Sequence, residues 1–450
     1  MAAALISAMH KSSGKTLVSL GIAAALAKRG LAVQPFKKGP DDIDPLWLSR
    51  AAGRPCFNLD FHTMGHAEIA ALFRARAGEF NLIEGNKSLY DGVDVEGADS
   101  NSALARLLDV PVVLVVDTRC MTRGIAPLIR GYREFETDIN IAGVILNRVG
   151  GSRHEGKLRA ALERYTDVPV LGAVGNQGFM AIAERHLGLI PANEAEAVDE
   201  KIAAVARIIE QSVDLDAISS LEGPSQKLAS ALARPASDVK IAVARDAAFG
   251  FYYPDDLEAL AGGGAELVMI DTLHDANLPD VDGLFIGGGF PETQAAALTA
   301  NASLRAQIRA ALEGGMPAYG ECGGLMYLSR SVEWQGWRHE MVGFVPGDVV
   351  MQERPVGRGY VRLRETADAP WPGSAEELAV HEFHHAALEN LPDGMRYAYA
   401  VTRGHGIDGR NDGLVLGNLL ASFSHQRHTA QNPWADRFLA FVRDCRKKAV

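Results

Sequence analysis

One cysteine lies in a sequence context that could make its thiol a nucleophile. Residues 317–326 read Pro-Ala-Tyr-Gly-Glu-Cys-Gly-Gly-Leu-Met, a pattern typical of a short strand, a sharp turn at Cys322 and a helix. A helix N-terminus lowers the pKa of a thiol, and free amides at such a turn can hold an oxyanion. We expect Gly323 to supply one amide and the turn at Gly288 and Gly289 to supply others. The alternative is a small buried cysteine packed among glycines.

Histidines that could serve as a base follow about a hundred residues later, which favours the nucleophile over the buried cysteine. His425 and His428 lie in a loop after the apolar run at 419–423, and either could activate the thiol. A second group, at 381–385, reads His-Glu-Phe-His-His and has the spacing of a zinc-binding helix. Its flanks indicate strand and loop, which argues against zinc. A zinc hydrolase is kept as an alternative that metal analysis can test.

The N-terminus contains a phosphate-binding pattern. Residues 9–16 read Met-His-Lys-Ser-Ser-Gly-Lys-Thr between an expected strand and an expected helix, the context that a phosphate-binding loop requires. The amides of Ser12, Ser13 and Gly14 would receive phosphates, Lys15 would neutralise charge, and Thr16 could hold Mg²⁺. Residue 9 is Met where the standard pattern has its first Gly. The alternative is a helix cap with an exposed lysine.

Acidic and amide side chains follow other expected strands of the N-terminal half. Asp41, Asp42 and Asp44 come directly after the second strand, and Glu84 ends the third. The carboxyl ends of parallel strands form the ligand-binding edge of such sheets, so these acids are expected to bind Mg²⁺ or substrate. A solvated turn is the alternative for residues 41–45. Asn147 could contact a purine edge or cap the following helix.

These residues must be positioned by α/β architecture, because short apolar runs alternate with helical patterns in both halves. We predict a P-loop, doubly wound parallel sheet in residues 1–212 and a second α/β domain in 238–450. Asp, Ser, Gly and Pro are dense at 213–237, which we interpret as a linker. Expected strands cover residues 3–8, 31–36, 80–85, 112–117 and 141–148 in the first half, and 239–244, 266–270 and 283–286 in the second.

The composition limits the class of protein. The chain has 450 residues and a net charge of −11, which disfavours nonspecific nucleic-acid binding and a basic membrane-surface role. Its four cysteines are far apart, so a disulfide framework is not indicated and a reducing cytoplasm fits. The apolar start leads directly into the Gly-Lys-Thr loop, as a first strand would, and we expect a soluble cytoplasmic protein.

Taken together, the motifs resemble the cobyrinic acid a,c-diamide synthase family, glutamine-dependent amidases of tetrapyrrole carboxylates. The resemblance covers nearly the whole chain, and the set is specific although no single motif is. The matching segments are residues 15–16, 33–37, 39–45, 53–60, 84–85, 89–92, 184–189, 242–249, 287–292, 321–324, 381–384 and 421–425.

The resemblance implies an ATP-dependent synthetase domain similar to dethiobiotin synthetase, followed by a class I-like glutamine amidotransferase domain. It implies that Cys322 is the glutaminase nucleophile and His425 its base. The Glu that class I enzymes carry two places after the base is absent, since Arg427 stands there, and a Cys–His dyad is implied to suffice. Thr16, Asp41 and Glu84 would surround Mg²⁺. The implied substrate-binding residues are Asp42, Asp44, Lys87, Tyr90 and Asp91.

The chain departs from the family pattern at three places, of which the first two flank the expected tetrapyrrole site. Asp42 replaces a usual Tyr, Lys87 and Ser88 replace Met-Gly, and residues 425–428 replace His-x-His-Phe. The expected partners are glutamine, ATP and a tetrapyrrole, with the a and c carboxylates of cobyrinic acid first and sirohydrochlorin, sirohaem or hydrogenobyrinic acid as alternatives. An alternative of another class is a regulatory P-loop ATPase with a degenerate amidase domain. The oligomeric state is open, with a homodimer as one option.

Overall fold

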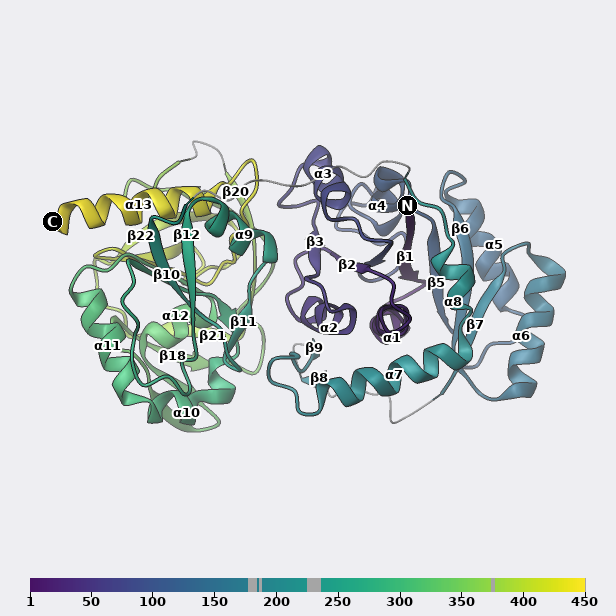
Figure 1. Cartoon of the computed structure of the whole chain (residues 1–450), viewed down its shortest axis with the longest axis horizontal. Helices are drawn as coiled ribbons and strands as arrows, with labels where there is room; N and C mark the ends of the chain where they lie inside the picture. Colours follow the sequence, from purple (N-terminus) through teal and green to yellow (C-terminus); the bar gives the residue numbers. More distant parts are fainter. Residues whose placement is uncertain (177–183, 186–187, 225–235, 374–376, 450) are drawn as a thin grey trace. The chain divides into compact units, whose positions relative to one another are not determined.

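The computed structural model describes the chain except for residues 177–183, 186–187, 225–235, 374–376 and 450. It forms two compact units, Met1–Ala231 and Leu232–Val450 (Figure 1). Each unit has its own sheet and its own core, as expected for two α/β domains. Among the described residues, no helix is long and apolar enough to cross a membrane.

The first unit is built on a seven-stranded parallel sheet of order β3-β2-β4-β1-β5-β6-β7. Its central strands are buried along nearly their whole length, which explains their almost continuous apolar sequences. The strands are β1 (Ala2–Ala8), β2 (Val33–Lys38), β3 (Phe57–Leu59), β4 (Phe80–Glu84), β5 (Val112–Asp117), β6 (Ile141–Val149) and β7 (Val170–Gly175).

Helices cover both faces of this sheet. Ala3 and Leu5 of β1 pack into one apolar cluster with α3, α4, α5 and α6, whereas Ala4 and Ile6 pack into another with α1, α2, α7 and α8. The predicted doubly wound arrangement is therefore confirmed. The helices are α1 (Lys15–Lys28), α2 (Ile43–Ala52), α3 (His66–Arg76), α4 (Asn101–Leu108), α5 (Ile125–Phe135), α6 (Ser152–Tyr165), α7 (Val198–Ser212) and α8 (Leu215–Ser219), with short strands β8 (Glu184–Arg185) and β9 (Gly188–Leu189).

The first half of the predicted linker differs from expectation, because residues 213–223 belong to the first unit. The Asp214 amide donates to Leu171 O at 2.7 Å, and the Ala3 amide donates to Leu221 O at 3.0 Å. Leu215 and Ile218 of α8 are buried in its core. The polar residues that suggested a linker partly serve as helix caps, since the Asp214 carboxylate accepts from the Ala217 amide. Residues 225–235 of the predicted linker lie outside the described residues.

The second unit has a nine-stranded mixed sheet of order β12-β10-β13-β15-β24-β23-β22-β19-β20. The first five strands in this order are parallel and carry the cysteine turn at the end of β15. The parallel strands are β10 (Val239–Ala244), β12 (Ala265–Ile270), β13 (Gly283–Ile286), β15 (Ala318–Glu321) and β24 (Leu419–Ser422). The antiparallel strands are β19 (Gly357–Glu365), β20 (Leu378–His384), β22 (Arg396–Arg403) and β23 (Asn411–Leu416).

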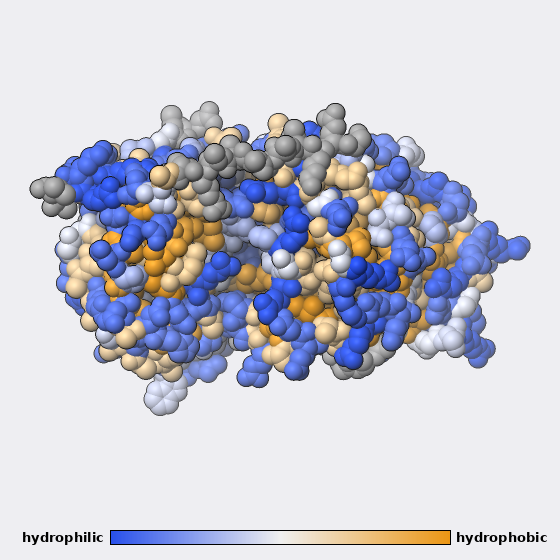
Figure 2. Space-filling view, in the orientation of Figure 1, coloured by the Kyte–Doolittle hydropathy of each residue, from blue (hydrophilic) through white to orange (hydrophobic). Residues whose placement is uncertain are grey.

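Helices again pack on both faces of the larger sheet. They are α9 (Pro254–Gly262), α10 (Ala295–Ala300), α11 (Ala302–Glu313), α12 (Gly323–Leu328) and α13 (Trp434–Ala449). A short 3₁₀ helix spans Pro291–Gln294, and β11 (Phe249–Phe251) pairs with β14 (Gly288–Gly289). A four-stranded sheet contains β16 (Ser329–Trp334), β17 (Trp337–Glu340), β18 (Val345–Met351) and β21 (Ala386–Glu389). The last turn of α13, which carries Arg446, Lys447 and Lys448, lies in a hydrophilic part of the surface (Figure 2).

Candidate active sites

The predicted phosphate loop lies between β1 and α1, at the point of the sheet where the connections from neighbouring strands run in opposite directions. Ser12 and Gly14 have positive φ angles of 64° and 94°, a backbone that turns successive amides toward one side. Gly14 has no room for a side chain, because a Cβ there would lie 2.2 Å from Asn147 Nδ2. Met9 is not among the described residues with positive φ, so its replacement of glycine requires no strained backbone.

Asn147 binds the phosphate loop itself. Its Nδ2 donates to Ser13 O at 2.8 Å, and its Oδ1 accepts from the Arg148 amide. The guanidinium of Arg148 donates to Ser12 O at 2.9 Å. The helix-cap interpretation of Asn147 is wrong, because α6 begins at Ser152 with Gly151 as its N-cap. Asn147 and Arg148 thus hold the loop from the end of β6.

A cluster of carboxylates surrounds Lys37 at the ends of β2 and β4. Its Nζ lies 2.5 Å from Asp44 Oδ2, 3.2 Å from Glu84 Oε1 and 3.9 Å from Asp41 Oδ2. Burial alone would lower the pKa of Lys37, but Asp44, Glu84 and Asp41 raise it well above its usual value. The ammonium therefore stays charged and holds three acids together. This role of Lys37, which lies next to the last residue of the buried strand β2, was not predicted from the sequence.

The same cluster fits a hard divalent cation. The Thr16 hydroxyl donates to Glu84 Oε1 at 2.7 Å, and Glu84 Oε2 is buried without a hydrogen-bond partner among the described residues. Burial, followed by the charge of Asp44, raises the pKa of Asp41 to about 7, and burial also raises the pKa of Glu84. A cation would relieve both effects. Hydroxyl and carboxylate oxygens are the ligands that Mg²⁺ prefers, so Thr16, Asp41 and Glu84 suit it.

Two more ammonium groups are buried at this edge without a carboxylate at ion-pair distance among the described residues. Lys15 Nζ donates to the carbonyl of Lys87 at 2.5 Å, and Lys38 Nζ donates to Asn86 Oδ1 at 3.2 Å. Burial lowers the pKa of each lysine to about 8. A buried cation with only neutral acceptors is costly unless an anion binds. This edge of the sheet is therefore suited to anionic ligands, and the sequence analysis missed Lys38.

The predicted substrate residues divide into two groups. Asp44 is committed to Lys37, and its Oδ2 lies 3.5 Å from the Thr16 hydroxyl. The hydroxyl of Tyr90 donates to the carbonyl of Tyr132, so it does not reach the carboxylate cluster. The remaining three are accessible: Asp42 is half-buried as the N-cap of α2, and Lys87 and Asp91 are exposed.

In the second unit, Cys322 lies on the predicted sharp turn between β15 and α12. Its φ of 49° and ψ of −100° are strained for a residue with a side chain. Its amide donates to Ser422 O at 2.7 Å, which fixes the turn on β24. The side chain is buried. A turn of this kind matches the nucleophile geometry expected from the sequence.

The glycines predicted to line the oxyanion site lie close to this turn. A Cβ on Gly323 would lie 3.1 Å from Gly289 N, and a Cβ on Gly288 would lie 2.6 Å from His425 Cε1. A Cβ on Gly289 would lie 2.0 Å from Ala248 O. The backbone at Ala248, at Gly288 and Gly289, and at Gly323 therefore packs too closely for side chains at the three glycines. The same packing brings Gly288 next to His425.

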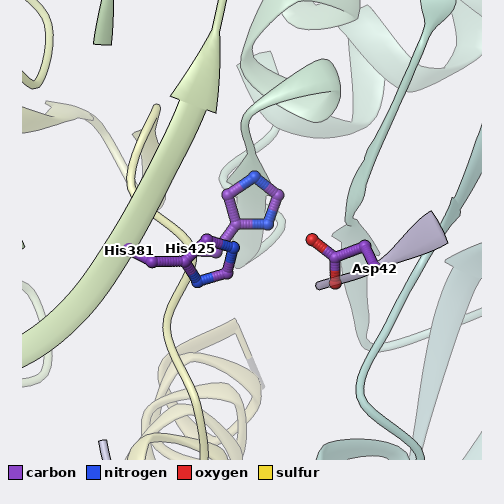
Figure 3. Close-up of side chains that lie close together, drawn as sticks. All are labelled: Asp42, His381 and His425. Atoms are coloured by element: carbon purple, nitrogen blue, oxygen red, sulfur yellow. The ribbon is translucent and has the colours of Figure 1, made fainter. Parts of the chain in front are cut away.

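His425 is the histidine that lies beside Cys322. It is buried in the loop after β24, and its Nδ1 lies 3.0 Å from Glu321 Oε1. Burial would lower the pKa of this imidazole, but the adjacent Cys322 and Glu321 raise it well above its usual value. The ring of His381 stacks on it at a centroid distance of 4.7 Å (Figure 3). The backbone amide of His428, in contrast, donates to Asp256 Oδ1 at 2.7 Å.

Arg427 occupies the place in the sequence where class I enzymes have a glutamate, and its guanidinium serves another purpose. Its Nη2 lies 2.7 Å from Asp255 Oδ2, and the group lies over the ring of Tyr253 at 4.9 Å. The acid that contacts His425 is instead Glu321, the residue before the nucleophile. It was not predicted from the sequence, where its signal was an acid at the end of an expected strand.

The helical zinc motif suggested for residues 381–385 is not formed. His381 and His384 lie in strand β20 and not in a helix, so the i, i+4 geometry of a zinc-binding helix is absent. The ring of His384 stacks on Phe423, and His385 Nδ1 lies 3.0 Å from Gln352 O. Glu382 accepts hydrogen bonds from the amides of His405 and Gly406. These side chains are engaged in contacts within the second unit.

Comparison with known proteins agrees with this division into two sites. Residues 6–189 match the CobQ/CobB/MinD/ParA nucleotide binding domain, and residues 240–433 match the CobB/CobQ-like glutamine amidotransferase domain. The cobyrinate a,c-diamide synthase of Magnetococcus marinus is 45% identical over 98% of this chain and 97% of its own length. Those of Methanosarcina barkeri and Archaeoglobus fulgidus are 39% and 40% identical, over 99% and 95% of this chain and 97% and 94% of their own lengths. The chain therefore belongs to the cobyrinate a,c-diamide synthase family.

Proposed function

We propose that this protein uses glutamine and ATP to amidate the a and c carboxylates of cobyrinic acid in cobalamin biosynthesis. The observation that carries the proposal is that Cys322 lies on a strained turn beside a buried histidine in one unit, while a carboxylate cluster surrounds Lys37 beside the phosphate loop in the other. Near full-length similarity to relatives named cobyrinate a,c-diamide synthase supports the substrate. A degenerate amidase domain would not retain the Cys322 turn with a buried histidine beside it.

The second unit would supply ammonia. His425 accepts the proton of the Cys322 thiol, and the thiolate attacks the side-chain amide carbon of glutamine. Amides of Gly323 and of the turn at Gly288 and Gly289 stabilise the oxyanion. His425 then returns the proton to the leaving nitrogen, so that ammonia and a thioester result, and water hydrolyses the thioester to glutamate.

The first unit would activate the substrate carboxylate. The loop at Ser12, Ser13 and Gly14 receives the phosphates of ATP, and Lys15 neutralises charge on the transferred phosphoryl group. Lys37 keeps the acids in place beside Thr16. The substrate carboxylate attacks the γ-phosphate to give an acyl phosphate, which ammonia converts to the amide with release of phosphate.

Mg²⁺ would be held by Thr16, Asp41 and Glu84, and when bound it neutralises the charge of the β- and γ-phosphates. The Asn147 amide, which fixes the loop, would act in nucleotide binding through Ser13. Asp42, Lys87 and Asp91 would face the macrocycle. Asp44 would lie near the substrate carboxylate and would act by holding Lys37 in place. Tyr90 would support this loop through Tyr132.

The proposal is tested by an amidation assay that offers cobyrinic acid, hydrogenobyrinic acid and sirohydrochlorin side by side, with glutamine and ATP. We expect cobyrinic acid to give a diamide with the highest kcat/KM. Mass spectrometry of the product distinguishes one amidation from two. Turnover of sirohydrochlorin alone would contradict the proposed substrate, and ATP hydrolysis without any amidation would contradict the ligase.

A further inference from the structure

A buried carboxylate lies against one nitrogen of the His425 ring. Glu321 is the last residue of β15 and precedes Cys322, so its backbone is fixed by the same turn. Its Oε1 lies 3.0 Å from His425 Nδ1, and both side chains are buried. Cys322 is a further charged neighbour of the same imidazole, and we assign the second ring nitrogen, Nε2, to its thiol.

The carboxylate is itself held in one orientation. The hydroxyl of Tyr319 donates to Glu321 Oε2 at 2.7 Å, and the amide of Gln426 donates to the same oxygen at 3.3 Å. No lysine or arginine of the described residues pairs with Glu321, so the imidazole is the cation that its buried charge can meet. One carboxylate oxygen is thus held by the protein while the other faces the imidazole, which is the arrangement of an acid that orients a histidine.

We propose that Glu321 is the positioning residue of the glutaminase site and replaces the acid that class I enzymes carry two places after the histidine. This inference rests on the proposed function of Cys322 and His425. Glu321 holds the imidazole with Nε2 toward the thiol and stabilises the imidazolium. The proton moves from Cys322 Sγ to His425 Nε2 and then to the leaving amide nitrogen as the C–N bond breaks. Glu321 keeps its charge and exchanges no proton.

The charges around the imidazole give this role a signature in the pH profile. Within the second unit His425 faces Cys322 at the N-cap of α12, Glu321 from β15 and His381 from β20. His381 Nδ1 lies 3.3 Å from the Tyr253 hydroxyl of the turn before α9. Loss of the Glu321 charge removes one of the interactions that raise the pKa of His425. The imidazolium then loses its proton at lower pH. The alkaline limb of glutamine hydrolysis should move to lower pH.

The test compares Glu321→Gln with Glu365→Gln in the full-length chain. Glu365 is the control, because it is a carboxylate of the same sheet with a mostly buried side chain, and the ion pair that it makes at 2.7 Å is with Arg437. We measure glutamine hydrolysis from pH 6 to 10, the rate of Cys322 alkylation by iodoacetamide, and synthesis with free ammonia. For Glu321→Gln we expect a fall in kcat on the order of a hundredfold, a shifted alkaline limb, slower alkylation and unchanged ammonia-dependent synthesis.

Glu321→Asp keeps the charge with a shorter side chain and should restore part of the rate and of the alkaline limb. Glu365→Gln should leave both unchanged. If Glu321→Gln lowers the rate without moving the limb, or if Glu321→Asp is no better than Glu321→Gln, the positioning role is contradicted. Cys322→Ala separates this outcome from failure of the proposed function: if Cys322→Ala still hydrolyses glutamine, the glutaminase assignment itself is wrong.

Discussion

At the scale of single residues, the choice between two histidines is the sharpest prediction about the base. His425→Ala should lower glutamine-dependent synthesis by roughly a hundredfold or more, because a positioned base contributes that much to a proton transfer. His428→Ala should have a small effect, since its backbone amide, which the change leaves in place, donates to Asp256 Oδ1. Steady-state kinetics with glutamine and with ammonia measure both. A larger loss for His428→Ala would move the base to the other histidine.

The residue scale also shows what the sequence could not reveal. The Cys322 turn was predicted from its local pattern, because glycines before and after a cysteine at a strand end indicate a sharp turn into a helix. The contact of Glu321 with His425 joins residues far apart in the chain, and no spacing rule links them. Lys37 was likewise hidden, because its role depends on Asp44 and Glu84 meeting at the ends of two strands.

At the scale of elements, the phosphate loop gives a prediction with a matched control at the other end of the same helix. Gly14 and Gly30 have φ angles of 94° and 90°, so an alanine at either position costs about 1–2 kcal/mol of backbone strain. A Cβ at Gly14 would also collide with Asn147 Nδ2, whereas a Cβ at Gly30 would meet nothing within 4 Å. Both variants should melt at a lower temperature than wild type.

Only Gly14→Ala should weaken ATP binding, because the collision displaces the Asn147 amide that fixes Ser13. Calorimetric titration with ATP and Mg²⁺ measures the Kd, and thermal unfolding measures the shared loss of stability. Equal ATP affinity in the two variants would show that the loop does not depend on its contact with Asn147.

Elements were predictable where their signal was local. The strands β5 and β10 have the bounds expected from the sequence, because they are mostly apolar runs that are buried except at Lys240. The antiparallel strands β19 and β22 were not predicted. They alternate polar and apolar residues and contain several charges, and only pairing with distant strands makes them part of the sheet.

At the scale of the whole molecule, two sites in two units predict that the reactions can be separated. Cys322→Ala should abolish synthesis with glutamine and leave synthesis with ammonium salts at high pH near the wild-type rate, because only the ammonia source is lost. The two nitrogen donors are compared at saturating ATP and substrate. Equal loss with both donors would mean that the units do not carry independent reactions.

Substrate choice depends on the whole surface that contacts the macrocycle, and a substitution of Lys87 can test it. Its side chain is exposed, and its backbone carbonyl accepts a hydrogen bond from Lys15 of the phosphate loop. The residue therefore lies beside the phosphate loop with its side chain in solvent. A cation there could pair with a rim carboxylate of the macrocycle, which is worth about 1.5–3 kcal/mol if the pair is desolvated. Sirohydrochlorin, with more carboxylates than cobyrinic acid, should gain more from this pair.

We therefore expect Lys87→Met to lower kcat/KM for sirohydrochlorin more than for cobyrinic acid. Lys157→Met, which removes an exposed lysine of α6, controls for the change in net charge and should leave both values unaltered. The backbone contact with Lys15 survives either change, so ATP binding should be the same in both variants. If Lys87→Met leaves the ratio of the two kcat/KM values unchanged, the lysine does not discriminate between macrocycles. Their selection must then come from other residues around the carboxylate cluster.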